Sequence, residues 1–79
     1  MKMKYTWTTQ YTLDITDEDF KEMVREAQRL ERVDEFDEDE AVSAAVQDYI
    51  ASLDDEIVYT ITEKIIQEIE YEVIAYLNN

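Results

Sequence analysis

The chain of 79 residues contains no cysteine, histidine, glycine or proline. Without cysteine and histidine it has no disulfide, no Cys–His nucleophile–base pair and none of the common zinc or haem ligand sets. Without glycine it has no glycine-rich phosphate-binding loop and lacks the usual cap at the end of a helix. Turns must be made by Asp, Asn, Thr and Ser, which favours a few, mostly helical elements over a many-stranded sandwich or barrel.

Basic residues are nearly absent from the second part of the chain. Residues 1–33 carry seven acids and six bases, whereas residues 34–79 carry fourteen acids and only Lys64, in a chain of net charge −14. This charge repels nucleic acids and anionic membrane surfaces and attracts basic partners. No apolar run approaches the roughly 20 residues that span a bilayer. We therefore expect a cytoplasmic protein with a basic protein partner and no direct contact with nucleic acid or membrane.

Length and composition predict a single α+β, mainly helical domain over residues 1–79. Apolar and polar residues alternate over residues 1–16, which is the period of a half-buried β-strand. Because this is long for one strand, the ribbon either bends near Thr8–Gln10 into a hairpin or pairs with the same strand of a second copy. We expect a homodimer through the apolar face of the ribbon, which includes Met3, Tyr5, Trp7, Tyr11 and Leu13.

Two helices are predicted to follow the ribbon. Thr16 is a good N-cap for a helix over about 17–32, in which apolar residues recur at helical spacing. Asp37 precedes Glu40 by three residues, the spacing of a capping box, and begins a second helix over about 38–53.

A third helix is predicted at the end of the sequence. Residues 56–62 are ambiguous, because their β-branched side chains favour a strand. However, aliphatic residues recur every four positions from Ile57 to Leu77, which predicts one long helix over about 55–77. Its otherwise polar side carries two apolar residues that indicate a contact with another chain, Tyr71 and Ile74.

The first predicted helix carries a stripe of basic residues: Lys21, Arg25, Arg29 and Arg32. Such a stripe suits phosphate contacts, but acids such as Glu22 and Glu26 are spaced to pair with it along the helix. We favour the ion pairs.

The acidic residues form the candidate partner-binding surface. The first group, the 34–40 cluster, consists of Asp34, Glu35, Phe36, Asp37, Glu38, Asp39 and Glu40, and the second, the 54–56 cluster, of Asp54, Asp55 and Glu56. Phe36 would be the apolar anchor among carboxylates that steer association. Neither the glycine nor the alternating ligands of an EF-hand are present, and so small a domain has little interior for a desolvated catalytic carboxyl group. We predict no catalytic residue, metal site or cofactor.

One part of the chain resembles a known family. An alternating strand at residues 11–16 leads into a capped helix with Ala27 eleven residues past the cap, and the second helix carries an apolar pattern over Val42–Tyr49. In these features Thr12–Leu53 resembles the ribbon-helix-helix family of dimeric regulators and antitoxins. The resemblance implies a dimer that reads DNA through strand positions Gln10, Thr12 and Asp14. The chain departs from the family in its longer helix–helix turn, which lacks glycine, and in having no Arg or Lys at those positions.

In overall character the chain looks like the small acidic inhibitors that phages make against host defence, including anti-CRISPR and anti-restriction proteins. Several of these imitate the charge spacing of a nucleic acid. Here the two clusters, with glutamates 63, 68, 70 and 72, would replace phosphates in a basic nucleic-acid-binding groove. We predict a non-enzymatic inhibitor of this kind, which would act in the host cytoplasm if it is phage-encoded. The alternatives are a dimeric ribbon-helix-helix regulator or antitoxin, and an acidic face that only confers solubility.

Overall fold

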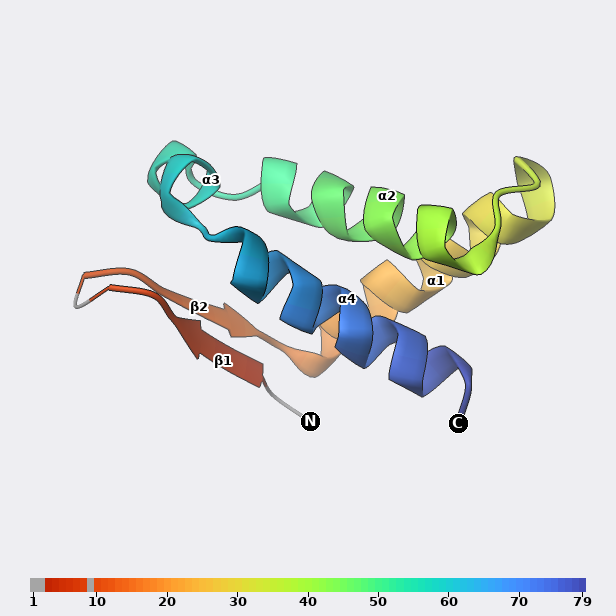
Figure 1. Cartoon of the computed structure of the whole chain (residues 1–79), viewed down its shortest axis with the longest axis horizontal. Helices are drawn as coiled ribbons and strands as arrows, with labels where there is room; N and C mark the ends of the chain where they lie inside the picture. The colour runs from red at the N-terminus through yellow and green to blue at the C-terminus, as the bar shows by residue number, and fades with distance from the viewer. Residues whose placement is uncertain (1–2, 9) are drawn as a thin grey trace.

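A β-hairpin followed by four helices makes up the described part of the chain, residues 3–8 and 10–79 of a computed structural model (Figure 1). Strands β1 (Met3–Thr6) and β2 (Thr12–Ile15) are antiparallel, with Tyr5 opposite Leu13. This confirms the α+β, mainly helical fold, and it shows that the predicted ribbon is a hairpin within one chain. The first two positions of that ribbon, and Thr9, lie outside the described residues.

The hairpin turns its apolar face toward the helices. Leu13 and Ile15 are buried, and Met3, Tyr5 and Trp7 are half-buried against the same core. Because side chains alternate between the two faces of a strand, this burial follows the predicted period of two. The ribbon therefore contributes to the core of its own chain.

A threonine makes the hairpin turn without glycine or proline. The Thr8 hydroxyl oxygen accepts hydrogen bonds from the backbone N–H groups of Gln10 and Tyr11, both at 3.1 Å. Tyr11 stacks on Trp7 across the turn, with ring centroids 6.3 Å apart. The Thr8 side chain thus makes the local hydrogen bonds to backbone N–H groups by which Asn, Asp, Ser and Thr favour turns.

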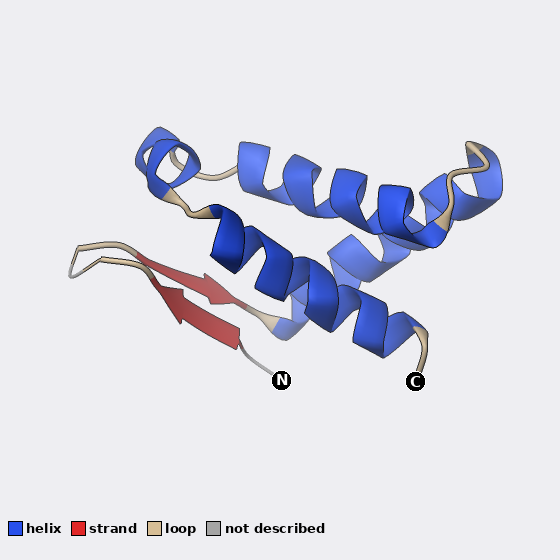
Figure 2. Cartoon of the chain, in the orientation of Figure 1, coloured by secondary structure: helices blue, strands red, loops and turns tan. Residues whose placement is uncertain are grey.

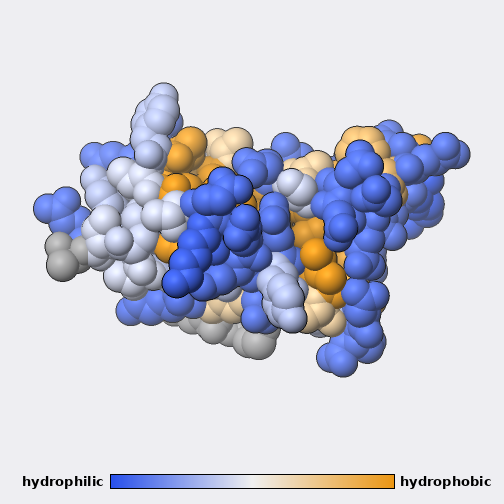
Figure 3. All heavy atoms as spheres, in the orientation of Figure 1, coloured by the Kyte–Doolittle hydropathy of each residue, from blue (hydrophilic) through white to orange (hydrophobic). Residues whose placement is uncertain are grey.

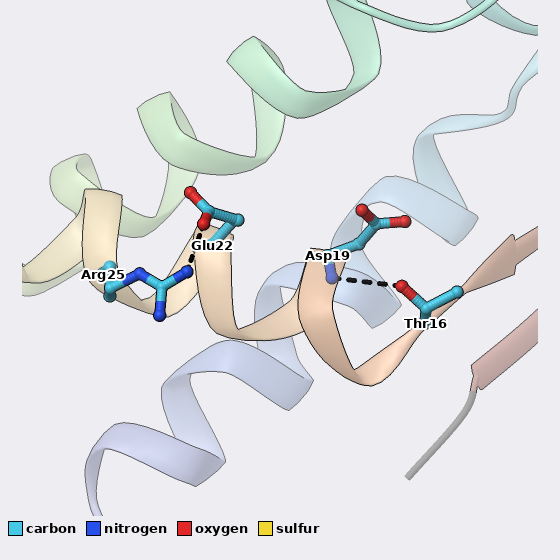
Figure 4. Close-up of polar contacts among 4 residues, drawn as sticks. All are labelled: Thr16, Asp19, Glu22 and Arg25. Carbon is cyan, nitrogen blue, oxygen red and sulfur yellow. Dashed lines mark hydrogen bonds and ion pairs between the residues drawn. The ribbon is translucent and has the colours of Figure 1, made fainter.

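The helices are α1 (Asp17–Val33), α2 (Glu38–Ala51), α3 (Asp55–Thr60) and α4 (Glu63–Leu77) (Figure 2). Both predicted N-caps are confirmed: Thr16 accepts a hydrogen bond from Asp19 N–H at 3.2 Å (Figure 4), and Asp37 accepts one from Glu40 N–H at 2.9 Å. Helix α1 packs most extensively on α2, and α4 packs against both (Figure 1). These three helices and the hairpin enclose one apolar core, and no buried side chain among the described residues is polar or charged.

The prediction of one helix over about 55–77 is wrong, because the helix is interrupted between α3 and α4. The Thr60 hydroxyl donates to the Glu56 carbonyl oxygen at 2.6 Å, and Ile61 has an extended backbone (φ −61°, ψ 137°). Thr62 then caps α4 through its side-chain oxygen. Threonine side chains compete with helical hydrogen bonds in this way. The four-residue apolar repeat continues across the break although the helical backbone does not.

The turn between α1 and α2 contains a strained residue. Glu35 has a φ of 57°, in the left-handed region, and the N–H groups of Asp34 and Phe36 on either side both donate to the Leu30 carbonyl oxygen, at 3.1 and 3.3 Å. Glycine is the usual residue at this point, just past the end of a helix. A residue with a Cβ atom is disfavoured there by about 1–2 kcal/mol.

The Glu35→Gly variant is expected to be more stable than its parent by up to about 1 kcal/mol. Glycine removes the strain, and its greater freedom in the unfolded chain offsets part of the gain. Urea denaturation measures the difference. Glu35→Ala is the control, because it removes the same charge and keeps the Cβ atom. An equal gain in both variants would show that charge, and not backbone conformation, is responsible.

Candidate partner-binding surface

The two acidic clusters lie at opposite ends of α2. The 34–40 cluster forms the α1–α2 turn and the first residues of α2, and the 54–56 cluster begins α3 beyond the other end (Figure 1). A helix of 14 residues separates them, which at 1.5 Å per residue is about 20 Å. The ten residues predicted as one partner-binding site therefore form two separate acidic surfaces.

The carboxylates of the 34–40 cluster are crowded. The Asp37 side chain raises the pKa of Glu40, first through a hydrogen bond between the two side chains and then through its charge. Glu38 accepts a hydrogen bond from the side-chain amide of Asn78 at 3.0 Å, which joins the start of α2 to the end of α4. Phe36 is 36% exposed, so its ring is accessible to a partner at the edge of the cluster.

The glutamates of α4 extend the acidic surface toward the hairpin. Burial raises the pKa of the Tyr5 hydroxyl, and the negative charges of Glu72 and Glu68 raise it further. These two glutamates are four residues apart and therefore lie on one face of the helix. Figure 3 shows that hydrophilic residues cover most of this side of the molecule, with hydrophobic residues in narrower areas between them.

The basic stripe of α1 is neutralised in part by its own helix. Glu22 pairs with Arg25 (Figure 4) and Glu26 pairs with Arg29, the latter at 2.6 Å, so these two predicted ion pairs are confirmed. The hydrogen bond from Arg29, with its charge, lowers the pKa of Glu26. The stripe is thus a mixed surface and does not present a row of uncompensated cations.

The residues predicted to form a dimer interface lie mainly against the protein's own helices. Leu13 is buried, and the other four, Met3, Tyr5, Trp7 and Tyr11, are half-buried. The homodimer stays a prediction. The placement of Ile74 on the polar side of its helix is wrong, because Ile74 packs against the core of this chain, and its contact with another chain stays a prediction. Tyr71, in contrast, is 73% exposed.

Ionisation of Tyr49 is expected to lower the stability of the fold at alkaline pH. Burial, the charge of Asp19 and a hydrogen bond with that carboxylate raise the pKa of the Tyr49 hydroxyl to about 12 from its ordinary value of 10. Below pH 10 the phenol is protonated in both the folded and unfolded chains. Between pH 10 and about 12 it ionises first in the unfolded chain, so the fold loses stability as the pH rises.

The Tyr49→Phe variant is expected to lose less stability than its parent over this pH window. The difference should be about 1 kcal/mol, since solvent screens a half-exposed group. Denaturant titrations at several alkaline pH values measure it. Tyr59→Phe is the matched control, because Tyr59 is 85% exposed. An identical loss in the parent and the Tyr49→Phe variant would show that Tyr49 is not responsible for the loss of stability at alkaline pH.

Comparison with known proteins assigns this surface to no family. No protein-family model matches the chain, and neither does any curated protein or solved structure. Within residues 3–8 and 10–79, no group of three or more acidic side chains is arranged to hold a metal ion. In the same part of the chain no helix has both the length and the apolar character needed to cross a membrane.

Proposed function

We propose that this chain is a non-enzymatic acidic binding protein that inhibits a basic, nucleic-acid-binding partner. Its carboxylates would occupy the partner's nucleic-acid-binding groove, as in the phage inhibitors of host defence that it resembles. The observation that carries the proposal is the uncompensated charge of residues 34–79, fourteen acids against Lys64. Every buried side chain among the described residues is apolar, so these charges lie at the surface.

The arrangement of the acids suits a long basic groove better than a single basic pocket. Two clusters about 20 Å apart, with the α4 glutamates as a third group, give a molecule 39 Å long several points of negative charge. Complementary charge raises the association rate of such a pair. Phe36 would add an apolar contact at one end, because binding energy concentrates in buried aromatic anchors.

Affinity capture with a polyanion competitor tests the proposal. Immobilised protein should retain basic nucleic-acid-binding proteins from a cell lysate, and duplex DNA or RNA should release them, because both ligands would occupy the same groove. Retention should also fall steeply with salt. Captured proteins that are not basic, or that stay bound in excess nucleic acid, would contradict the proposal.

A ribbon-helix-helix regulator is the second candidate, and the order β2–α1–α2 with its confirmed caps favours it. One observation argues against DNA binding. The pairing of the hairpin places Asp14 directly opposite Lys4, so a negative charge lies beside this lysine of the ribbon. We expect no measurable affinity for duplex DNA at physiological salt, since the net charge opposes the polyanion. A gel shift with random and operator-like duplexes measures this. A specific complex at nanomolar protein would instead establish the regulator.

A further inference from the structure

A groove lies between the start of α1 and the end of α4 and has room for about 400 Å³. Its lining includes Asp17, Phe20, Lys21, Glu72, Ala75 and Tyr76. Phe20 is buried and meets the Tyr76 ring edge to face, with centroids 5.5 Å apart. Tyr76 itself is 53% exposed. The groove therefore presents an aromatic ring, that of Tyr76, which packs against Phe20 and is still accessible to a ligand.

A carboxylate stands beside that ring. Glu72 and Tyr76 are four residues apart on α4, so their side chains lie on the same face of the helix. Ala75 has only a methyl group and leaves the groove open between α4 and α1. Glu38 of the 34–40 cluster is hydrogen-bonded to Asn78, so this acidic cluster adjoins the same end of α4.

Two other grooves suit a cation less well. The groove between α1 and α2 also contains Tyr49 and Asp48, but the Tyr49 ring is half-buried. Its two glutamates, Glu22 and Glu26, are already paired with arginines of α1. The groove between the hairpin and α4 contains Glu68 and two half-buried aromatic rings, Tyr5 and Trp7. It is also lined by Lys4 and Lys64, which repel a cation. The α1–α4 groove combines a glutamate with an exposed aromatic ring, that of Tyr76, and its lining contains one lysine, Lys21.

We propose that the α1–α4 groove binds an arginine side chain of the basic partner, with its guanidinium stacked on Tyr76 and paired with Glu72. Arginine fits better than lysine, because a planar guanidinium both stacks on an aromatic face and forms two parallel hydrogen bonds with a carboxylate. The inference rests on the proposed function, since it names a contact within the acidic surface.

Oligoarginine and oligolysine peptides of equal length and charge are the probes. Titrated against the intact protein at one salt concentration, the arginine peptide should bind about tenfold more tightly. Ala75→Leu fills the groove without removing a charge, and Tyr76→Ala removes the ring. Both should lower the affinity for arginine to near that for lysine and weaken binding of the lysine peptide much less. Lys21→Gln, which removes the competing cation, should raise the affinity for arginine a few-fold.

Matched controls lie outside the groove. Ala51→Leu makes the same change at the exposed end of α2, and Tyr71→Ala removes an exposed ring from α4; both should keep the preference for arginine. Circular dichroism verifies that each variant is folded. Equal binding of both peptides, or a preference that survives Ala75→Leu, would overturn the groove and leave the proposed function standing. Failure of the parent to bind either peptide would overturn the proposed function itself.

Discussion

The Ile69→Ala variant is expected to lose about 3–4 kcal/mol of its free energy of unfolding. Ile69 lies on α4 with no exposed surface, within the core that α4 shares with α1 and α2. Replacing a buried isoleucine by alanine removes hydrophobic contacts and leaves a cavity, at a typical cost of about 2–5 kcal/mol. Small domains have only about 5 kcal/mol in total, so the variant should keep about 1–2 kcal/mol, and roughly a tenth of it should be unfolded at 25 °C.

Thermal and urea denaturation, followed by circular dichroism, measure this loss. Ile66→Ala is the control on the same helix, because Ile66 is only half-buried and should cost about half as much. Equal losses at the two positions would show that α4 does not pack on the other helices through the face that contains Ile69.

The second large effect is expected in the kinetics of binding. Changing Asp37, Asp39, Asp54 and Asp55 to asparagine removes two charges from each acidic cluster. If the clusters steer a basic partner, its association rate should fall about tenfold at low salt, with little change in dissociation. Stopped-flow mixing with the oligoarginine peptide measures both rates. Unchanged association would mean that the clusters serve only solubility.

A charge-matched variant separates the position of the charge from its amount. It neutralises four exposed acids outside the clusters: Asp14, Glu18, Glu31 and Asp48. Because both variants lose the same net charge, only a site-specific effect distinguishes them. Equal slowing in the two variants would assign steering to the whole molecule and not to the clusters.

The cluster variant should also be more stable than its parent. The pKa of Glu40 is raised in the folded chain, so its ionisation opposes folding above that pKa, and the penalty fades as the pH falls through it. Stability should therefore rise from pH 7 toward roughly pH 5, and with added salt, and the variant should show weaker dependence on both. The cap on α2 survives, since asparagine replaces Asp37 as an N-cap.

The sequence predicts the elements that rest on local chemistry. Thr16 and Asp37 cap α1 and α2 because their side chains reach the N–H three residues on, a contact within one turn. The alternation from Met3 to Ile15 predicts which face of the hairpin is buried, although it leaves open whether the second strand belongs to the same chain.

What the sequence does not predict depends on contacts between distant segments or on competition within one segment. The break at Ile61 follows from two threonine hydroxyls, whereas the aliphatic repeat indicates a continuous helix. The separation of the acidic clusters follows from the length of α2. The α1–α4 groove joins Phe20 to Tyr76, 56 positions apart, and its only local signal is the four-residue spacing of Glu72 and Tyr76.

Trp7 provides a fluorescent probe of the contact between the hairpin and α3. Its indole N–H donates to the Thr60 hydroxyl at 3.0 Å, which in turn donates to the Glu56 carbonyl, so one chain of hydrogen bonds links the hairpin to α3. Trp7 is also the only tryptophan of the sequence. Its fluorescence therefore reports the opening of this junction, while circular dichroism reports the helices. Comparison of the two signals during unfolding would reveal whether the hairpin detaches before the helical core melts.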